Sequence, residues 1–252
     1  MKLQHLFLSL FVLFPTNFLY SLEKTSGFDL YEPGIFNPLG PTLLYGNSDI
    51  QRRPYMLMAL NEKNEIIEKS LLQYNKDGRL IAEKIFDSKN QLKGEVLYKY
   101  DEKGNVVEET YKDFSGNILA KKIRHYRNNV LDQIDVYDAN ELVFSRRYKY
   151  EKNQITGREI QKGISEPFVI KLKNGLIESV EFREKNTKLM EIKYRYLQDK
   201  LVERIKTTGD AQSKCEYIYD NNNRLKEYIY YDFIRSKWIK TKTIQFVYAD
   251  QV

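Results

Sequence analysis

A short phrase recurs down this chain, in which a tyrosine-rich run meets an acidic or amide turn and then an apolar run. Its clearest copy is LYKYDEKGNVVEET at residues 97–110, and weaker copies begin at residues 71, 111 and 216. The tyrosines before alternate turns, Tyr74, Tyr100, Tyr126 and Tyr150, follow one another at intervals of 26, 26 and 24 residues. Self-similarity at this period indicates a repeat architecture in which each repeat is one small structural unit.

The residues between turn signals alternate as they do in β-strands. From residue 56 to the end of the chain, turns rich in Asn, Asp and Gly lie about a dozen residues apart, which suits one strand plus one turn. In MEIKYRY, Ile192 and Tyr194 point to one face and Lys193 points to the other. The pattern therefore predicts an antiparallel meander of repeated β-hairpins, with about 14 to 16 short strands.

A sheet with this many strands exceeds what an open, twisted sheet usually carries before it curls. We therefore predict an all-β fold with a strongly curved, rolled or barrel-like sheet. Each hairpin buries its apolar face only beside the next one. A Tyr-x-Tyr pair recurs in five strands, and we interpret it as a packing layer rather than a binding surface. These pairs are Tyr98/Tyr100, Tyr148/Tyr150, Tyr194/Tyr196, Tyr217/Tyr219 and Tyr228/Tyr230.

The N-terminal segment has the layout of a secretory signal peptide. Lys2 precedes an apolar run from Leu6 to Phe14, which is shorter than the roughly 20 residues that a membrane-spanning helix needs. We predict a signal peptide at residues 1–21 with cleavage after Ser21, and a buried N-terminal helix is the alternative.

Residues 22–55 differ from the rest of the chain because they hold four of its six prolines. Proline fixes its own backbone and lacks an N–H donor, so this stretch cannot form a central strand or a long helix. It also carries several large apolar side chains. We predict an extended Pro/Gly-rich arm that covers an end or an exposed edge of the sheet, or alternatively a partly disordered tail. The hairpin-repeat domain then spans residues 56–252.

Two stretches, YKYDEKGNVVEETYKD and YIYDNNNRLKEYIYYD, resemble the YD repeats of the RHS family. The matching positions are Tyr100, Asp101, Gly104 and Asn105 in the first stretch, and Tyr219, Asp220, Asn223, Arg224 and Leu225 in the second. The resemblance implies an extracytoplasmic protein built from β-hairpins. Family members coil into shells, bind carbohydrates or enclose toxic domains. This chain is too short for such a shell, so an encapsulating role is not expected.

The charge of the chain is mildly basic and mixed. The sequence has 41 Lys and Arg against 35 Asp and Glu, and removal of Lys2 with the signal peptide lowers the net charge from +6 to +5. Interleaved charges of both signs do not indicate a nucleic-acid-binding protein. After the signal peptide no apolar run approaches membrane-spanning length, and strands such as AKKIRHYR would place Lys or Arg on both faces of a transmembrane barrel. We expect an exported protein that is periplasmic, associated with the outer surface or secreted.

Groups that could perform catalysis are scarce in the exported chain. It holds one histidine, His125, which excludes a site with several histidine ligands, and one cysteine, Cys215, which cannot form an internal disulfide. We expect Cys215 to be buried on the aromatic face beside Tyr217. Turn acids such as Asp101 and Asp220 lack the ligand spacing of a calcium loop, and turn closure explains them. No catalytic residue, metal or cofactor is predicted.

Two basic clusters are candidate binding surfaces. In FIRSKWIKTK the only tryptophan, Trp238, is surrounded by Arg235, Lys237, Lys240 and Lys242. Cations interleaved with an aromatic ring suit a polyanion, a sugar chain or an anionic membrane surface, and the alternative is an exposed edge strand protected by its lysines. The second cluster consists of Lys121, Lys122, Arg124 and Arg127.

These features predict a non-enzymatic, exported binding or structural protein of the bacterial cell envelope. Its partner would be an envelope polymer, a carbohydrate or another protein. Two alternatives belong to other functional classes. One is a carbohydrate-active hydrolase that uses paired carboxylates in a groove of the sheet, and the other is a periplasmic partner or inhibitor that presents an edge strand. The sequence does not predict an oligomeric state.

Overall fold

The structure of the protein is a computed structural model that describes residues 53–161, 163–184, 187–198 and 200–249. Within these ranges it consists of sixteen antiparallel strands joined by short turns. The strands are β1 (Met56–Asn61), β2 (Ile66–Tyr74), β3 (Leu80–Asp87), β4 (Leu92–Tyr100), β5 (Val106–Asp113), β6 (Ile118–Arg127), β7 (Val130–Asp138), β8 (Glu141–Tyr150), β9 (Gln154–Gln161), β10 (Ile164–Lys173), β11 (Leu176–Glu184), β12 (Thr187–Leu197), β13 (Lys200–Thr208), β14 (Ala211–Tyr219), β15 (Leu225–Ile234) and β16 (Lys237–Val247).

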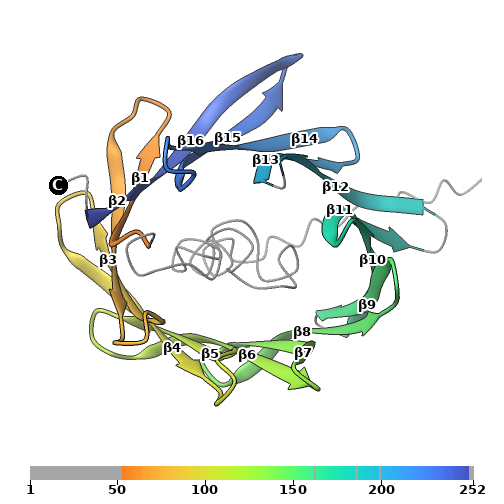
Figure 1. Cartoon of the computed structure of the whole chain (residues 1–252), viewed down its shortest axis with the longest axis horizontal. Coiled ribbons are helices and arrows are strands. Elements are labelled where there is room, and N and C mark those ends of the chain that lie inside the picture. Colours follow the sequence, from red (N-terminus) through yellow and green to blue (C-terminus); the bar gives the residue numbers. More distant parts are fainter. Residues whose placement is uncertain (1–52, 162, 185–186, 199, 250–252) are drawn as a thin grey trace, which may run out of the picture.

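Every strand pairs with the strands before and after it in the sequence, and β16 pairs with β1. The closing register joins Met56 to Val247 and Asn61 to Lys242, so that the sheet forms a complete ring (Figure 1). The predicted all-β meander and the rolled sheet are therefore confirmed. In the described ranges, no helix has the length and apolar character needed to cross a membrane.

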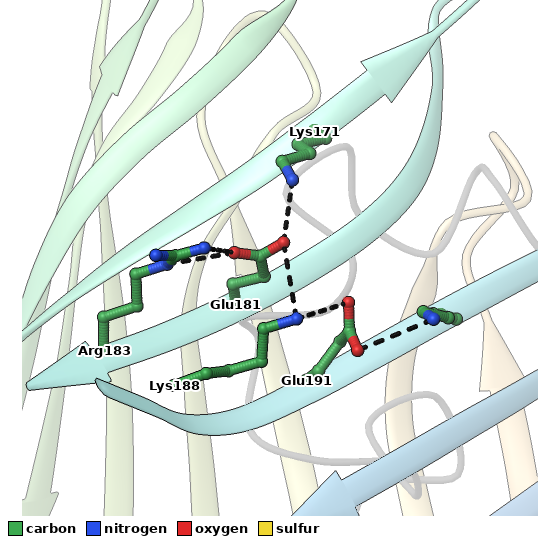
Figure 2. A network of polar contacts seen from close by, with 6 residues as sticks. Lys171, Glu181, Arg183, Lys188 and Glu191 are labelled. Carbon is green, nitrogen blue, oxygen red and sulfur yellow. Dashed lines mark hydrogen bonds and ion pairs between the residues drawn. The ribbon is translucent and has the colours of Figure 1, made fainter. Parts of the chain in front are cut away.

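The two faces of the sheet differ in chemistry. The inner face carries two apolar clusters, one on β13–β16 and β1–β6 and the other on β7–β12. Tyr98, Tyr217 and Tyr228 are buried there, as the packing-layer interpretation predicts. The outer face carries many of the charged residues, including the ion pairs shown in Figure 2, which views β10–β12 with strands of the opposite wall behind them.

A five-residue turn recurs, and its first side chain closes it. In the turn after β4, Asp101 Oδ1 accepts the backbone N–H of Asn105 at 2.8 Å, and Gly104 adopts a φ of 88°, which favours glycine. After β14, Asp220 Oδ1 accepts the N–H groups of Asn222 and Arg224. The predicted role of the turn acids in closing the hairpins is therefore confirmed.

A tyrosine at the end of several even-numbered strands, or directly after one, makes a second recurring contact. Its hydroxyl donates to a backbone carbonyl at the start of the preceding strand, at the end of the ring that we call the tyrosine rim. These pairs are Tyr74 with Pro54, Tyr100 with Leu80, Tyr126 with Val106, Tyr219 with Leu201 and Tyr248 with Leu225. Each pair closes the open end of a hairpin whose turn lies at the opposite rim.

The predicted signal peptide at residues 1–21 and most of the predicted arm at residues 22–55 lie outside the described residues. The structure does describe the last three residues of the arm, Arg53 to Tyr55. The backbone N–H of Tyr55 donates to the carbonyl of Val247 at 2.9 Å, and its carbonyl accepts the N–H of Leu72 at 2.8 Å. The end of the arm is thus joined to β16 and β2.

Candidate functional site

The β15–β16 hairpin continues past both of its neighbours. The pairing of β15 with β14 ends at Asp232, and the pairing of β16 with β1 begins at Lys242. Residues 233–241 lie beyond these limits and form what we call the hairpin tip, in which Phe233 pairs with Trp238 and Ile234 pairs with Lys237 across the turn. Figure 1 shows this hairpin, in blue, extending beyond the outline of the ring.

Large apolar side chains lie on the two faces of the hairpin tip. Phe233 and Trp238 are cross-strand partners, with ring centroids 5.0 Å apart. Lys214 of β14 reaches over this outer side, with its Nζ 5.1 Å from the centroid of the Trp238 ring. Ile234 and Ile239 alternate with them and therefore point the other way, with exposed fractions of 50% and 42%.

The structure gathers most of the first predicted basic cluster at this tip. Arg235 lies in the tight turn with a φ of 49°, and Lys237 is exposed at the start of β16. Lys240 Nζ lies 2.5 Å from Asn64 Oδ1 in the turn after β1. Lys242 departs from the prediction, because it shares the inner face with Tyr230 and its Nζ lies 5.8 Å from that ring. β16 is not an edge strand over Lys242–Val247, where it pairs with β1, but residues 237–241 lie before that pairing begins, so the exposed-edge alternative is not contradicted there.

The second predicted cluster is divided between the two faces of β6. Lys122 and Arg124 point inward to Glu109, at 3.2 and 2.5 Å, and their side chains are almost fully buried. Burial, together with two nearby guanidinium groups, holds the pKa of Lys122 well below its usual value. Lys121 points outward, and the exposed Arg127 pairs with Asp132 at 3.0 Å. The prediction of one continuous basic patch is therefore wrong, because alternate residues of a strand point to opposite faces.

An outer-face network that the sequence analysis missed spans β10, β11 and β12 (Figure 2). Glu181 accepts hydrogen bonds from Lys171 at 2.7 Å and from Arg183 at 2.6 Å, and Lys188 bridges to Glu191 at 3.0 Å. The hydrogen bonds from Lys171 and Arg183 lower the pKa of Glu181 from 4.5 to about 2. The partners come from three strands, so only the register between those strands could have revealed the network.

The two candidate reactive groups occupy ordinary structural positions. His125 Nε2 lies 2.9 Å from Asp135 Oδ2, and Gln133 donates to the same carboxylate. In the register Asp135 lies opposite Ile123 of β6 and Ser145 of β8, and His125 lies opposite Gln133, so the imidazole reaches the carboxylate diagonally. Cys215 is 1% exposed, which confirms its predicted burial. The described ranges contain no cluster of three or more His, Cys, Asp or Glu residues suited to a metal ion.

A shallow depression of about 280 Å³ lies between two neighbouring turns of the tyrosine rim. The amide of Asn105 donates to Asn129 Oδ1 at 2.7 Å and joins the two turns. The depression is lined by Asp101, Glu102, Lys103, Tyr126, Asn128 and Asn129. One aromatic ring with several amide and carboxylate groups is a surface that could hold a small polar molecule.

No protein-family model matches the chain, and no curated protein matches its sequence. Similar solved structures include a porin-like protein from Bacteroides uniformis, at 12% identity and a TM-score of 0.42, covering 77% of this chain and 96% of that chain. TcdB2-TccC3 is similar at 11% identity and a TM-score of 0.29, over 75% of this chain but 14% of its own length. A protein with unknown function (BF3112) from Bacteroides fragilis matches at 14% identity and a TM-score of 0.25, over 52% of this chain and 94% of that chain. Similarity at this level concerns the all-β fold alone.

Proposed function

We propose that this protein is an exported, non-enzymatic binding module of the bacterial cell envelope that holds an anionic polymer or surface. The observation that carries the proposal is the hairpin tip, where the rings of Trp238 and Phe233 pack against each other beside cations, beyond the end of pairing with β14 and β1. The predicted signal peptide supports export. The closed ring also supports the proposal, because it provides a framework that holds the hairpin in place.

Charge at the tip favours an anionic partner. Residues 228–247 contain four cations and a single acid, Asp232. Three of these cations, Arg235, Lys237 and Lys240, lie in the hairpin tip itself. An aromatic ring beside ammonium and guanidinium groups gives both stacking area and charge attraction to a polyanion or a phosphate-bearing surface.

The proposal is tested by capture of purified anionic envelope polymers on immobilised protein. We expect Trp238→Ala and Lys240→Glu to reduce capture, whereas Leu142→Ala and Lys76→Glu serve as matched controls away from the tip. Leu142 is an exposed apolar residue at the start of β8, and Lys76 is an exposed cation in the turn after β2. Equal capture by the wild type and both tip variants would remove the tip as the binding site.

A specific pair of acids supports a second candidate, the carboxylate-dependent hydrolase. Glu159 of β9 and Glu166 of β10 are direct cross-strand partners on the inner face. Burial and the nearby Glu159 and Glu184 raise the pKa of Glu166, which is the condition that a general acid requires. Arg146 forms an ion pair with Glu159 at 2.7 Å. Turnover of an envelope polysaccharide that is lost in both Glu159→Gln and Glu166→Gln would establish this candidate.

The other alternative, a partner module that presents an edge strand, fits this fold poorly. β1 and β16 would be the edges of an open meander, and they pair with each other over six residues on each strand. Their backbone groups in this stretch are therefore used within the sheet, as in closed barrels generally.

A further inference from the structure

The hairpin tip has an unusual distribution of apolar side chains. In a sheet that covers a core, one face of each strand is apolar and the other is polar. At the tip, Phe233 and Trp238 occupy the outer side, while Ile234 and Ile239 occupy the opposite side. The exposed fractions of Phe233, Ile234 and Ile239 are 39%, 50% and 42%. The tip therefore exposes apolar area on both faces.

Backbone pairing with the neighbouring strands stops before the hairpin tip. β14 pairs with β15 only as far as Asp232, and β1 pairs with β16 only from Lys242 onward. A flat protein partner or a single polymer chain laid on one face would leave the other face in water. Burial of both faces at once requires a medium that surrounds the hairpin on all sides.

We infer that the hairpin tip inserts into the interfacial region of a bilayer that contains anionic lipid, and so docks the barrel peripherally on a membrane surface. This inference rests on the proposed function, because it specifies the anionic partner of the same tip. Trp and Phe favour the boundary between headgroups and acyl chains, and the two isoleucines fit the apolar side of that boundary. Arg235 and Lys237 lie at the apex, and their long side chains reach back to the lipid phosphates, while Lys240 lies nearer the ring beside Asn64.

The rest of the same rim limits how the barrel can lie on the membrane. Its turns expose further apolar side chains, namely Ile66, Leu92, Phe114, Ile118, Leu142 and Ile164. These turns also carry acids, among them Asp87, Asp113 and Asp138, which an anionic surface repels. The basic hairpin lies in another sector of the ring from these acids (Figure 1). The barrel therefore docks tilted, with the tip as its deepest part.

Trp238 makes the inference directly measurable, because it is the only tryptophan of the chain. The purified protein is mixed with vesicles of phosphatidylcholine alone or of phosphatidylcholine with phosphatidylglycerol. With the anionic vesicles we expect Trp238 emission to move to shorter wavelength and to be quenched by lipids brominated on their acyl chains. Vesicles of phosphatidylcholine alone should produce much smaller changes.

Vesicle flotation of two sets of variants tests the insertion of the apolar side chains and the attraction of the cations to anionic lipid separately. Ile234→Ser with Ile239→Ser should abolish flotation, whereas Leu142→Ser, which changes an equally exposed residue on the same rim, should not. Arg235→Asn with Lys237→Gln should weaken partitioning into anionic vesicles about 30-fold, since each cation near such a surface contributes about one factor of five. Asn suits the positive φ at position 235, and Lys76→Gln is the control.

Unchanged Trp238 emission with both kinds of vesicle would overturn the inference. If the protein still captured lipid-free anionic polymers through the tip, the proposed function would survive that failure. Equal binding to neutral and anionic vesicles would also overturn it, because the cations would then have no role.

Discussion

The hydroxyl of Tyr100 donates a 2.7 Å hydrogen bond to the carbonyl oxygen of Leu80, and the two residues end β4 and begin β3 respectively. The guanidinium of Arg79, one residue before the acceptor, lies 5.6 Å from the centre of the same ring. The pair Tyr219 and Leu201 repeats this relationship, with Lys200 as the cation. In both copies of the repeat, a tyrosine ring, a backbone carbonyl that accepts its hydroxyl and a basic side chain near the ring lie together. They close the open end of the hairpin.

Replacement of Tyr100 by Phe keeps the ring and removes only the hydroxyl. We expect the free energy of unfolding to fall by about 0.5–1.5 kcal/mol, the usual net value of one hydrogen bond. Urea unfolding of the purified variant measures this loss. Tyr150→Phe is the matched control, since within the described ranges the structure shows no hydrogen bond from the Tyr150 hydroxyl. An equal loss in both variants would mean that the hydroxyl contact is not the cause.

The same tyrosines should make the protein sensitive to alkali. Burial raises the pKa of Tyr219 to about 12, and the pKa of Tyr100 also rises to about 12. Unfolded tyrosine ionises near pH 10, so the unfolded state loses these protons first. The free energy of unfolding should therefore fall as the pH rises from about 10 to about 12. In Tyr219→Phe the fall should be smaller, and an identical pH profile for the variant would contradict the assignment.

Local features of this fold were readable from the sequence because they depend on neighbouring residues. The turn at Asp101–Asn105, the burial of Cys215 and the alternation along β12 each follow from spacing within one strand or turn. The number of strands followed from counting these strand-and-turn segments, and the curvature of the sheet followed from that number.

Features that depend on the register between strands could not be predicted from the sequence. The ring closes between Met56 and Val247, which are far apart in the sequence, and no local pattern signals that contact. Lys122 looked like a surface cation beside Lys121, but it points inward to Glu109, its direct cross-strand partner on β5. We predicted a patch because these charges are close in the sequence. Successive side chains of a strand point to opposite faces, so the charges are divided between the two sides of the sheet.

Acid should weaken the protein through Glu181, whose pKa of about 2 lies below the ordinary value of 4.5. The unfolded state takes up this proton first as the pH falls, so the stabilisation is complete above about pH 5 and is lost towards pH 2. We expect about 1–2 kcal/mol, because Lys171 and Arg183 are partly exposed and water screens them. Glu181→Gln should remove this part of the pH dependence. The exposed Glu178→Gln should not, and equal acid profiles for both variants would contradict a special role for Glu181.

Two glycines should respond differently to an added side chain, because one is crowded and the other is not. A Cβ on Gly157 would lie 2.1 Å from the Arg147 carbonyl oxygen and 2.3 Å from Cζ of Phe168, so Gly157→Ala should cost about 1–3 kcal/mol or more. Gly116 has a φ of 87° with open space around its Cβ position. Asn occupies the same turn position at residues 64, 90 and 223.

Gly116→Asn should therefore change the free energy of unfolding by less than about 0.5 kcal/mol, whereas Gly116→Ala should lose about 1 kcal/mol because alanine tolerates positive φ poorly. Thermal and urea unfolding of the three variants distinguish crowding from backbone strain. A stable Gly157→Ala variant would show that β8 and β10 can separate enough to admit a methyl group, and would contradict the tight packing of Phe168 over this glycine.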